Sequence, residues 1–245
     1  MNCGINLVGL FILVLLTSIL STYLLIRVMT KFGIVDMPEA RRAHARPTPR
    51  GGGASLVLIV TFALPFFEYC MSGEYLLSIQ VLQLLLPLAV ISFLDDVSHV
   101  LVPLRLFIHF ICACFAIKWL VHPNNILHYD TPMWLDLTLG TFALATFLNV
   151  YNFLDGIDGI TASESIHMSI TILLLCMLRA DVIPHVELVV AIATIILAWS
   201  LGFVLFNWQP AKIFLGDVGS ITLGFLLGLV LLIIASSGPR LFLAC

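Results

Sequence analysis

The chain has 245 residues, of which 61% are hydrophobic and only 10% are charged, and its mean hydropathy is +1.12. A soluble domain carries roughly 25% charged residues, so this composition excludes an ordinary soluble protein and predicts an integral membrane protein. The net charge of −3 carries little information by itself, and no nucleic-acid partner is predicted.

Eight apolar stretches approach the length of about 20 residues that a membrane-spanning helix needs. The ten-residue alternating pattern of a transmembrane barrel is absent from the sequence, so we predict an all-α, polytopic bundle of about eight transmembrane helices. The first stretch lacks a basic region before it and a small-residue cleavage site after it, which favours an anchor over a cleaved signal. The predicted spans are Leu7–Ile26, Gly53–Tyr69, Tyr75–Leu94, Leu101–Val121, Met133–Val150, Ile160–Leu178, Val186–Phe206 and Ile221–Ala235.

Basic residues gather between the first and second spans, where Lys31, Arg41, Arg42, Arg46 and Arg50 lie. The positive-inside rule therefore places this loop in the cytoplasm and the N-terminus outside. Counting spans onward predicts four cytoplasmic segments, at about 27–52, 95–101, 151–159 and 207–220. Because nearly all unusual polar groups fall in these four segments, we predict a single active site on the cytoplasmic face.

The first cytoplasmic segment includes a loop, residues 40–53, that mixes four arginines, a histidine and three glycines. Arginine forks bind phosphates, and glycines expose backbone N–H groups to anions. A loop that merely sets the topology is the alternative interpretation. The residues predicted to contact an anionic substrate are His44, Arg46, Arg50, Gly51 and Gly52.

The adjacent carboxylates Asp95 and Asp96 follow the third span. Adjacent like charges raise each other's pKa unless a cation neutralises them. We therefore predict a catalytic role for both, as a general base or beside a divalent metal. The alternative is a pair of helix-end charges that face lipid headgroups.

At the end of the fifth span, two amides and two carboxylates recur every three residues: Asn149, Asn152, Asp155 and Asp158. Carboxylates are costly at membrane depth, so their clustering indicates a functional site. Oxygen ligands suit Mg²⁺ or Mn²⁺, and Mg²⁺ suits phosphate chemistry. We predict substrate contacts for Asn149, Asn152 and Asp158, and a catalytic or metal-binding role for Asp155. A polar loop that caps a helix is the alternative.

The segment after the seventh span carries Asn207, Lys212 and Asp217. Asp217 stands between glycines at the start of the last span, and Ser220 is a candidate cap for that helix, where backbone N–H groups suit a phosphate. Lys212 offers a point charge for the same anion. We predict Asp217 as a metal ligand and Asn207 and Lys212 as substrate contacts; ordinary capping with a lysine that reaches the interface is the alternative.

With these motifs, the chain resembles the polyprenyl-phosphate N-acetylhexosamine-1-phosphate transferases of glycosyltransferase family 4. The resemblance runs from the first span to about Gly224 and is closest to the branch that initiates O-antigen synthesis. It implies a Mg²⁺-dependent enzyme of the bacterial inner membrane that transfers a sugar 1-phosphate from a UDP-N-acetylhexosamine to a polyprenyl phosphate, with release of UMP. Membrane lipid surrounds such an enzyme. A homodimer is compatible with the sequence, which carries no signal for oligomeric state.

One departure from the family concerns the C-terminal part. Family members carry further spans and a histidine-rich loop, and neither follows the eighth predicted span. We therefore expect residues 1–245 to form a single, C-terminally shortened transferase domain, with an inactive family member as the alternative. A cation-coupled transporter is a less favoured alternative, because its carboxylates would lie near the midplane and repeats would be expected. The Asp-Gly-x2-Ala-Arg pattern of CDP-alcohol phosphotransferases is absent.

Overall fold

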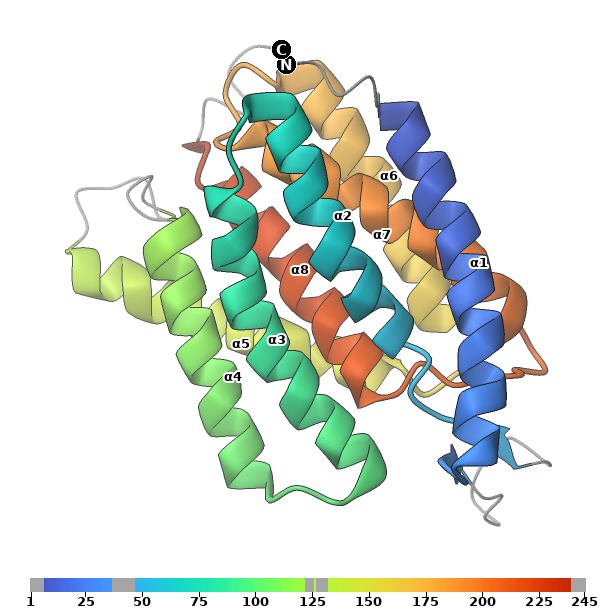
Figure 1. Cartoon of the computed structure of the whole chain (residues 1–245). Helices are drawn as coiled ribbons and strands as arrows, with labels where there is room; N and C mark the ends of the chain where they lie inside the picture. The colour runs from blue at the N-terminus through green and yellow to red at the C-terminus, as the bar shows by residue number, and fades with distance from the viewer. Residues whose placement is uncertain (1–6, 37–46, 122–125, 127–131, 239–245) are drawn as a thin grey trace.

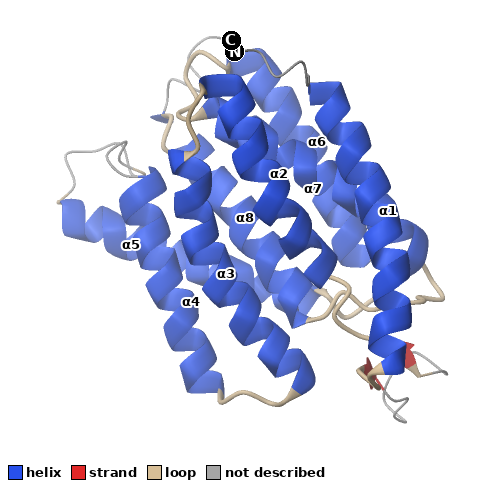
Figure 2. Ribbon diagram, viewed as in Figure 1, coloured by secondary structure: helices blue, strands red, loops and turns tan. Residues whose placement is uncertain are grey.

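The computed structural model describes residues 7–36, 47–121, 126 and 132–238, and over these residues the chain is a bundle of long helices (Figures 1 and 2). A short π-helix, Ile117–Val121, continues α4, and two short antiparallel strands, β1 (Val35–Asp36) and β2 (Thr48–Pro49), follow α1. The α-helices are α1 (Leu7–Lys31), α2 (Ala54–Ser72), α3 (Leu76–Val97), α4 (Val102–Ala116), α5 (Met133–Leu154), α6 (Ile160–Arg179), α7 (Val186–Asn207) and α8 (Asp217–Ala235).

The predicted architecture is confirmed: among the described residues, eight helical segments are long and apolar enough to cross a membrane. Several helices extend beyond the predicted spans: α1 continues to Lys31, five residues past the predicted end, and α2 and α3 each continue three residues further than predicted. Two of the differences involve predicted site residues. Helix α5 continues to Leu154, so that Asn152 is helical rather than part of a loop. Helix α8 begins at Asp217, four residues before the predicted start, because its first N–H groups are capped by another helix, as described below.

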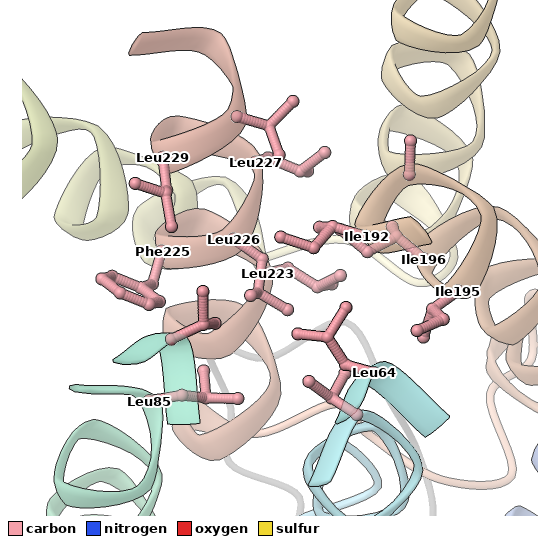
Figure 3. Packing of buried hydrophobic residues seen from close by; sticks show 14 of the residues in the cluster. Leu64, Leu85, Ile192, Ile195, Ile196, Leu223, Phe225, Leu226, Leu227 and Leu229 are labelled. Atoms are coloured by element: carbon pink, nitrogen blue, oxygen red, sulfur yellow. The ribbon is translucent and has the colours of Figure 1, made fainter. Parts of the chain in front are cut away.

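The most buried helices, α7 and α8, are those with apolar residues on every side. The most apolar 18-residue windows of α7 and α8 are 72% and 83% buried, whereas that of α1 is 22% buried. Figure 3 shows side chains of α7 and α8 meeting Leu64 of α2 and Leu85 of α3. Helices that are hydrophobic all round need cover on all sides, which explains why these two occupy the interior.

Small residues allow close packing of helix backbones around α8. A Cβ atom added to Gly224 would lie 2.8 Å from the Cα of Leu148 on α5, and one added to Gly53 would lie 2.0 Å from the Cα of Gly219. Close approach at small residues is a principal source of packing energy between membrane helices. The glycines therefore bring α5, α8 and the start of α2 into direct backbone contact.

Hydrogen bonds between buried side chains also connect α1, α2 and α7. The Ser18 hydroxyl donates to the Trp199 carbonyl at 2.8 Å, and the Trp199 indole N–H donates to the Ser55 hydroxyl at 2.9 Å. Both hydroxyl groups are thereby satisfied away from water, as buried polar groups require.

The alternating helices bring all the described motifs to one end of the bundle. At this end, which we call the polar end, α1, α3, α5 and α7 finish and α2, α4, α6 and α8 begin (Figure 1). Residues from the four predicted cytoplasmic segments contact one another here, for example Arg50 and Asp217, which are 167 positions apart. The prediction that these segments share one face is confirmed for the described residues, and His44 and Arg46 lie outside them.

Candidate active site

A cavity of about 530 Å³ opens at the polar end, between the α5–α6 turn, the α7–α8 loop and the segment before α2. This volume lies within the range of small-molecule sites, roughly 300–1,000 Å³. The polar residues that line the cavity are Asp36, Arg50, Asn152, Asp155, Asp158, Asn207, Gln209 and Asp217.

Arg50 connects two of the predicted carboxylates. Its Nη2 lies 2.7 Å from Oδ1 of Asp217, and its Nε lies 2.8 Å from Oδ1 of Asp96. Burial works against the charged form, but the carboxylates of Asp96 and Asp217 outweigh it and raise the pKa of the Arg50 guanidinium above its ordinary value. Arg50 therefore stays protonated in the cavity wall, and the substrate contact predicted for it stays a prediction.

A second arginine, Arg105 of α4, approaches Asp217 from the other side. Its Nη1 lies 3.1 Å from Oδ2 of Asp217 and also contacts Oδ2 of Asp95. Asp95 in addition accepts a hydrogen bond of 2.8 Å from the Val100 N–H. Asp217 is thus held between two guanidinium groups, with Asp95 balancing the second of them.

Asp96 caps helix α8 from helix α3. Its carboxylate accepts the N–H groups of Asp217 at 2.8 Å and Val218 at 3.1 Å, and its side chain is fully buried. A negative charge at a helix N-terminus satisfies free N–H groups and complements the helix dipole. This contact positions Asp217, and it replaces the predicted cap by Ser220, whose hydroxyl accepts a hydrogen bond from Asn152.

Neither Asp95 nor Asp96 lines the cavity. Their contacts to Arg105, Arg50 and the start of α8 give both carboxylates a structural explanation. The catalytic role predicted for the pair stays a prediction, and the geometry favours positioning for Asp96.

Substitution Asp96→Asn tests this positioning role. Asparagine keeps one side-chain oxygen for three donors, the N–H groups of Asp217 and Val218 and Nε of Arg50, and it removes the negative charge. We therefore expect the free energy of unfolding to fall by about 3 kcal/mol. The measurement is the melting temperature of the purified protein in detergent. The matched control is Asp181→Asn, because Asp181 is exposed in the α6–α7 turn at the opposite end. An unchanged melting temperature in Asp96→Asn would show that the cap is dispensable.

Asn152 and Asp155 face the cavity from the end of α5, one helical turn apart. The Asn152 amide donates to the Ser220 hydroxyl at 3.1 Å, and the Thr161 hydroxyl donates to Oδ1 of Asp155 at 2.6 Å. Burial raises the pKa of Asp155 to about 7; the Thr161 hydrogen bond opposes this shift, and the charge of Asp217 adds to it. Burial therefore favours the protonated form of Asp155 more than that of an exposed carboxyl group.

Asp158 and Asn207 hold two walls of the cavity together. Asp158 accepts the Ala211 N–H at 3.0 Å, and Asn207 accepts the Gly159 N–H at 3.0 Å while donating to the Ile213 carbonyl at 3.0 Å. These bonds join the α5–α6 turn to the α7–α8 loop. Both side chains still line the cavity, so substrate contact remains a prediction for each.

Other predicted substrate contacts are engaged elsewhere or lie away from the cavity. The Gly52 N–H donates to the Phe214 carbonyl at 2.9 Å, so it docks the loop and is not available to an anion in this arrangement. Gly51 adopts a left-handed conformation, φ +92°, at the bend before α2. Asn149 donates to the Ala145 carbonyl within α5, and Lys212 is exposed. Gly51, Gly52, Asn149 and Lys212 do not line the cavity.

The family model of glycosyl transferase family 4 matches residues 78–235, well over half of the chain and the region that holds α3 to α8. The chain belongs to glycosyl transferase family 4. The match includes most of the described site, among it Asp96, Asp155 and Asp217, whereas Arg50 lies before it.

Curated relatives of this family-4 chain are transferases. A probable undecaprenyl-phosphate N-acetylglucosaminyl 1-phosphate transferase of Bacillus subtilis (strain 168) is 26% identical over 236 residues, which cover 94% of this chain and 63% of that protein. A phospho-N-acetylmuramoyl-pentapeptide-transferase of Borrelia hermsii is 26% identical over 231 residues, covering 82% and 65%. One of the same description from Streptococcus uberis is 29% identical over 243 residues, covering 91% and 70%. The chain thus spans less than two thirds of the length of the first two.

The family-4 site has the donor chemistry for a magnesium ion. Asp155, Asp217 and the amide of Asn152 line one cavity, and oxygen donors are those Mg²⁺ prefers. Among the described residues, no three acidic, histidine or cysteine side chains are grouped tightly enough to enclose a metal. Magnesium is commonly held by one or two carboxylates together with water and substrate phosphates. The residues therefore fit an ion that Asp217 and Asp155 would hold with the substrate.

Sequence reasoning did not assign two features of the site. Arg105 stands in the first turn of α4, and the need of a charge at the start of a membrane helix for a partner is the signal in the sequence that points to it. Gln209 and Asp36 line the cavity only because the α7–α8 loop and the β1–β2 pair fold toward it. Their position depends on contacts between distant segments and has no local signature.

Proposed function

We propose that this chain transfers N-acetylhexosamine 1-phosphate from a UDP-sugar to a polyprenyl phosphate and releases UMP. The observation that carries the proposal is a cavity at the end of an apolar helical bundle, lined by Asp155, Asp217 and Arg50. The descriptions of the curated relatives as transferases support the same chemistry. A site at one end of the spans also argues against a transporter, whose ion sites lie near the midplane.

The reaction brings two anions together. An oxygen of the lipid phosphate attacks the sugar-linked phosphorus of the donor, the bond from that phosphorus to the bridging oxygen breaks, and the oxygen leaves with UMP. Arg50 supplies a fixed positive charge toward these phosphates, and it stays ionised because of its carboxylate partners. A magnesium ion held by Asp217 and Asp155 would neutralise phosphate charge and stabilise the leaving UMP.

Asp155 is the residue we assign to proton transfer. A phosphate monoester has a second pKa of about 6, so a lipid phosphate still carries a proton for part of the time at neutral pH. Without a bound metal the pKa of Asp155 is raised to about 7, so its carboxyl suits acceptance of this proton when Asp217 alone holds the ion. When Asp155 also holds the ion, its carboxylate is ionised and stores no proton. Asp96, which is fully buried and already accepts hydrogen bonds from α8, suits this role less well.

The lipid substrate needs an apolar path to the cavity. Helix α5 carries a shallow, mostly apolar hollow that faces outward and extends to Val150, four residues before the end of the helix at the polar end. We assign the polyprenyl tail to this surface. The residues that line the hollow are Leu139, Phe142, Ala143, Thr146, Phe147 and Val150.

The proposal includes a location and a pathway. Basic residues before α2 favour the cytoplasmic face of the bacterial inner membrane for the polar end, with the N-terminus outside. Undecaprenyl phosphate and UDP-N-acetylglucosamine are the first substrates to test, and initiation of O-antigen or another cell-envelope glycan is the proposed use.

The deciding experiment is release of UMP by the purified chain from UDP-N-acetylglucosamine, undecaprenyl phosphate and Mg²⁺. The proposal expects release that needs both substrates and stops when the metal is chelated. If no UMP is released from this donor, the other UDP-N-acetylhexosamines are tested next. A folded protein that is inactive with every donor would contradict the proposal and favour the inactive-member alternative.

A further inference from the structure

Several buried polar atoms behind the Asp95–Arg105–Asp217 contact have no hydrogen-bond partner. Among the described residues they include the Ser92 hydroxyl on α3, Nε of Arg105 on α4 and the Thr222 hydroxyl on α8. His109 on α4 adds one ring nitrogen, because Asn149 is a hydrogen-bond partner for only one of the two. Buried polar groups are nearly always paired, so a cluster of unpaired ones calls for a polar occupant.

These atoms lie at a similar depth in the bundle. Ser92 is five residues before the end of α3, Thr222 is five residues after the start of α8, and His109 is seven residues after the start of α4. At 1.5 Å per residue, these positions are roughly 8–10 Å from the polar end. Helix α3 packs on α4 and α8, and α5 packs on the same two helices, so the four form a ring around this level.

His109 is the most informative member of the cluster. Its side chain is fully buried, Asn149 is a hydrogen-bond partner for its imidazole, and Arg105 and Asp95 act on it through their charges. Arg105 lies one turn before it on the same face of α4, at the i,i+4 spacing at which side chains meet. The Nη1 group of Arg105 is committed to Asp95 and Asp217, which leaves its buried Nε–H without an acceptor.

We propose that an ordered water molecule occupies this level and joins the Arg105 Nε–H to the ring nitrogen of His109 that is not paired with Asn149. Water suits the site because it both donates and accepts, and buried waters typically make about three hydrogen bonds to such groups. Through this bridge His109 is a positioning residue: it fixes the plane of the Arg105 guanidinium, which in turn holds Asp217 and Asp95. The kinetic consequence rests on the proposed transferase function, whereas the hydrogen bond does not.

The kinetic experiment compares His109→Leu with His109→Gln. Leucine cannot hold the water, and we expect kcat to fall on the order of 10-fold, with KM for the UDP-sugar changed by less than about 2-fold, because a hydrogen bond to a charged group is lost. Glutamine restores polar atoms and is expected to stay within about 3-fold of the parent. His167→Leu is the matched control, since His167 is exposed on α6. Full activity of His109→Leu, or equal damage by both variants, would overturn the proposal.

A structural experiment decides independently of activity. Selective ¹⁵N labelling of histidine, with His109 assigned by its absence in His109→Gln, gives the ring-nitrogen shifts in detergent micelles. Arg105→Lys removes the Nε–H, so we expect the resonance of a His109 ring nitrogen to shift. Lys118→Arg, in the π-helix that continues α4, is expected to leave that resonance unchanged. No response to Arg105→Lys would refute the bridge even in an active enzyme. A response in a protein that transfers no sugar would keep the bridge and reject the proposed function.

Discussion

The Asp217→Asn protein is expected to release UMP on the order of 10³-fold more slowly than the parent at saturating Mg²⁺. Asparagine has nearly the same shape and keeps an oxygen that accepts a hydrogen bond from Arg50 or Arg105. It lacks the negative charge that balances the two guanidinium groups and would attract a metal ion. The loss removes one of the two cavity carboxylates assigned to the ion. The measurement is the initial rate of UMP release, with metal titrated in both proteins.

Two comparisons make this result interpretable. Asp181→Asn removes a carboxylate from the opposite end of the bundle and is expected to leave the rate unchanged. The melting temperature of Asp217→Asn separates loss of chemistry from loss of fold, because the capping contact from Asp96 uses the backbone N–H of residue 217, which the substitution keeps. A folded Asp217→Asn protein that transfers sugar within a few-fold of the parental rate would remove Asp217 from the metal site.

The second large effect is expected from Gly53→Ala, which destabilises the junction of α2 and α8. An added Cβ would lie 2.0 Å from the Cα and 2.4 Å from the N of Gly219, both backbone atoms that cannot rotate away. The backbone of Gly53, φ −64° and ψ −14°, suits any residue, so the contact alone causes the damage. We expect a loss of about 3 kcal/mol or more, and a melting temperature lower by roughly 6–12 °C.

Gly156→Ala is the matched control for this substitution. A Cβ at Gly156 meets nothing within 4 Å, so its melting temperature is expected to match that of the parent. Because Arg50 precedes Gly53 by three residues and Asp217 precedes Gly219 by two, the same substitution separates the two charged partners. Equal melting temperatures for Gly53→Ala and Gly156→Ala would show that the helices do not approach as closely as described.

Much of the candidate site was predictable because its residues stand out within the sequence. Asp155 and Asp217 are carboxylates beside glycines at the ends of apolar runs, and both line the cavity as the pattern indicated. The roles of their neighbours were less predictable. Asp96 belongs to an equally conspicuous pair, yet its carboxylate is buried against the first N–H groups of α8. The sequence shows which carboxylates are costly to bury, but it does not show which group of the protein pairs with each of them.

The sequence by itself determined the class of fold, the number of spans and the gathering of polar motifs at one end, because hydrophobicity adds up along each segment and helices must alternate in direction. Only the tertiary structure decided which groups pair: Arg50 and Arg105 with Asp217, Asp96 with α8, and Gly53 with Gly219. These pairs join segments that lie far apart along the chain. Their formation depends on the rotation and the distance of packed helices, which arise from the whole set of side-chain contacts and from no local pattern.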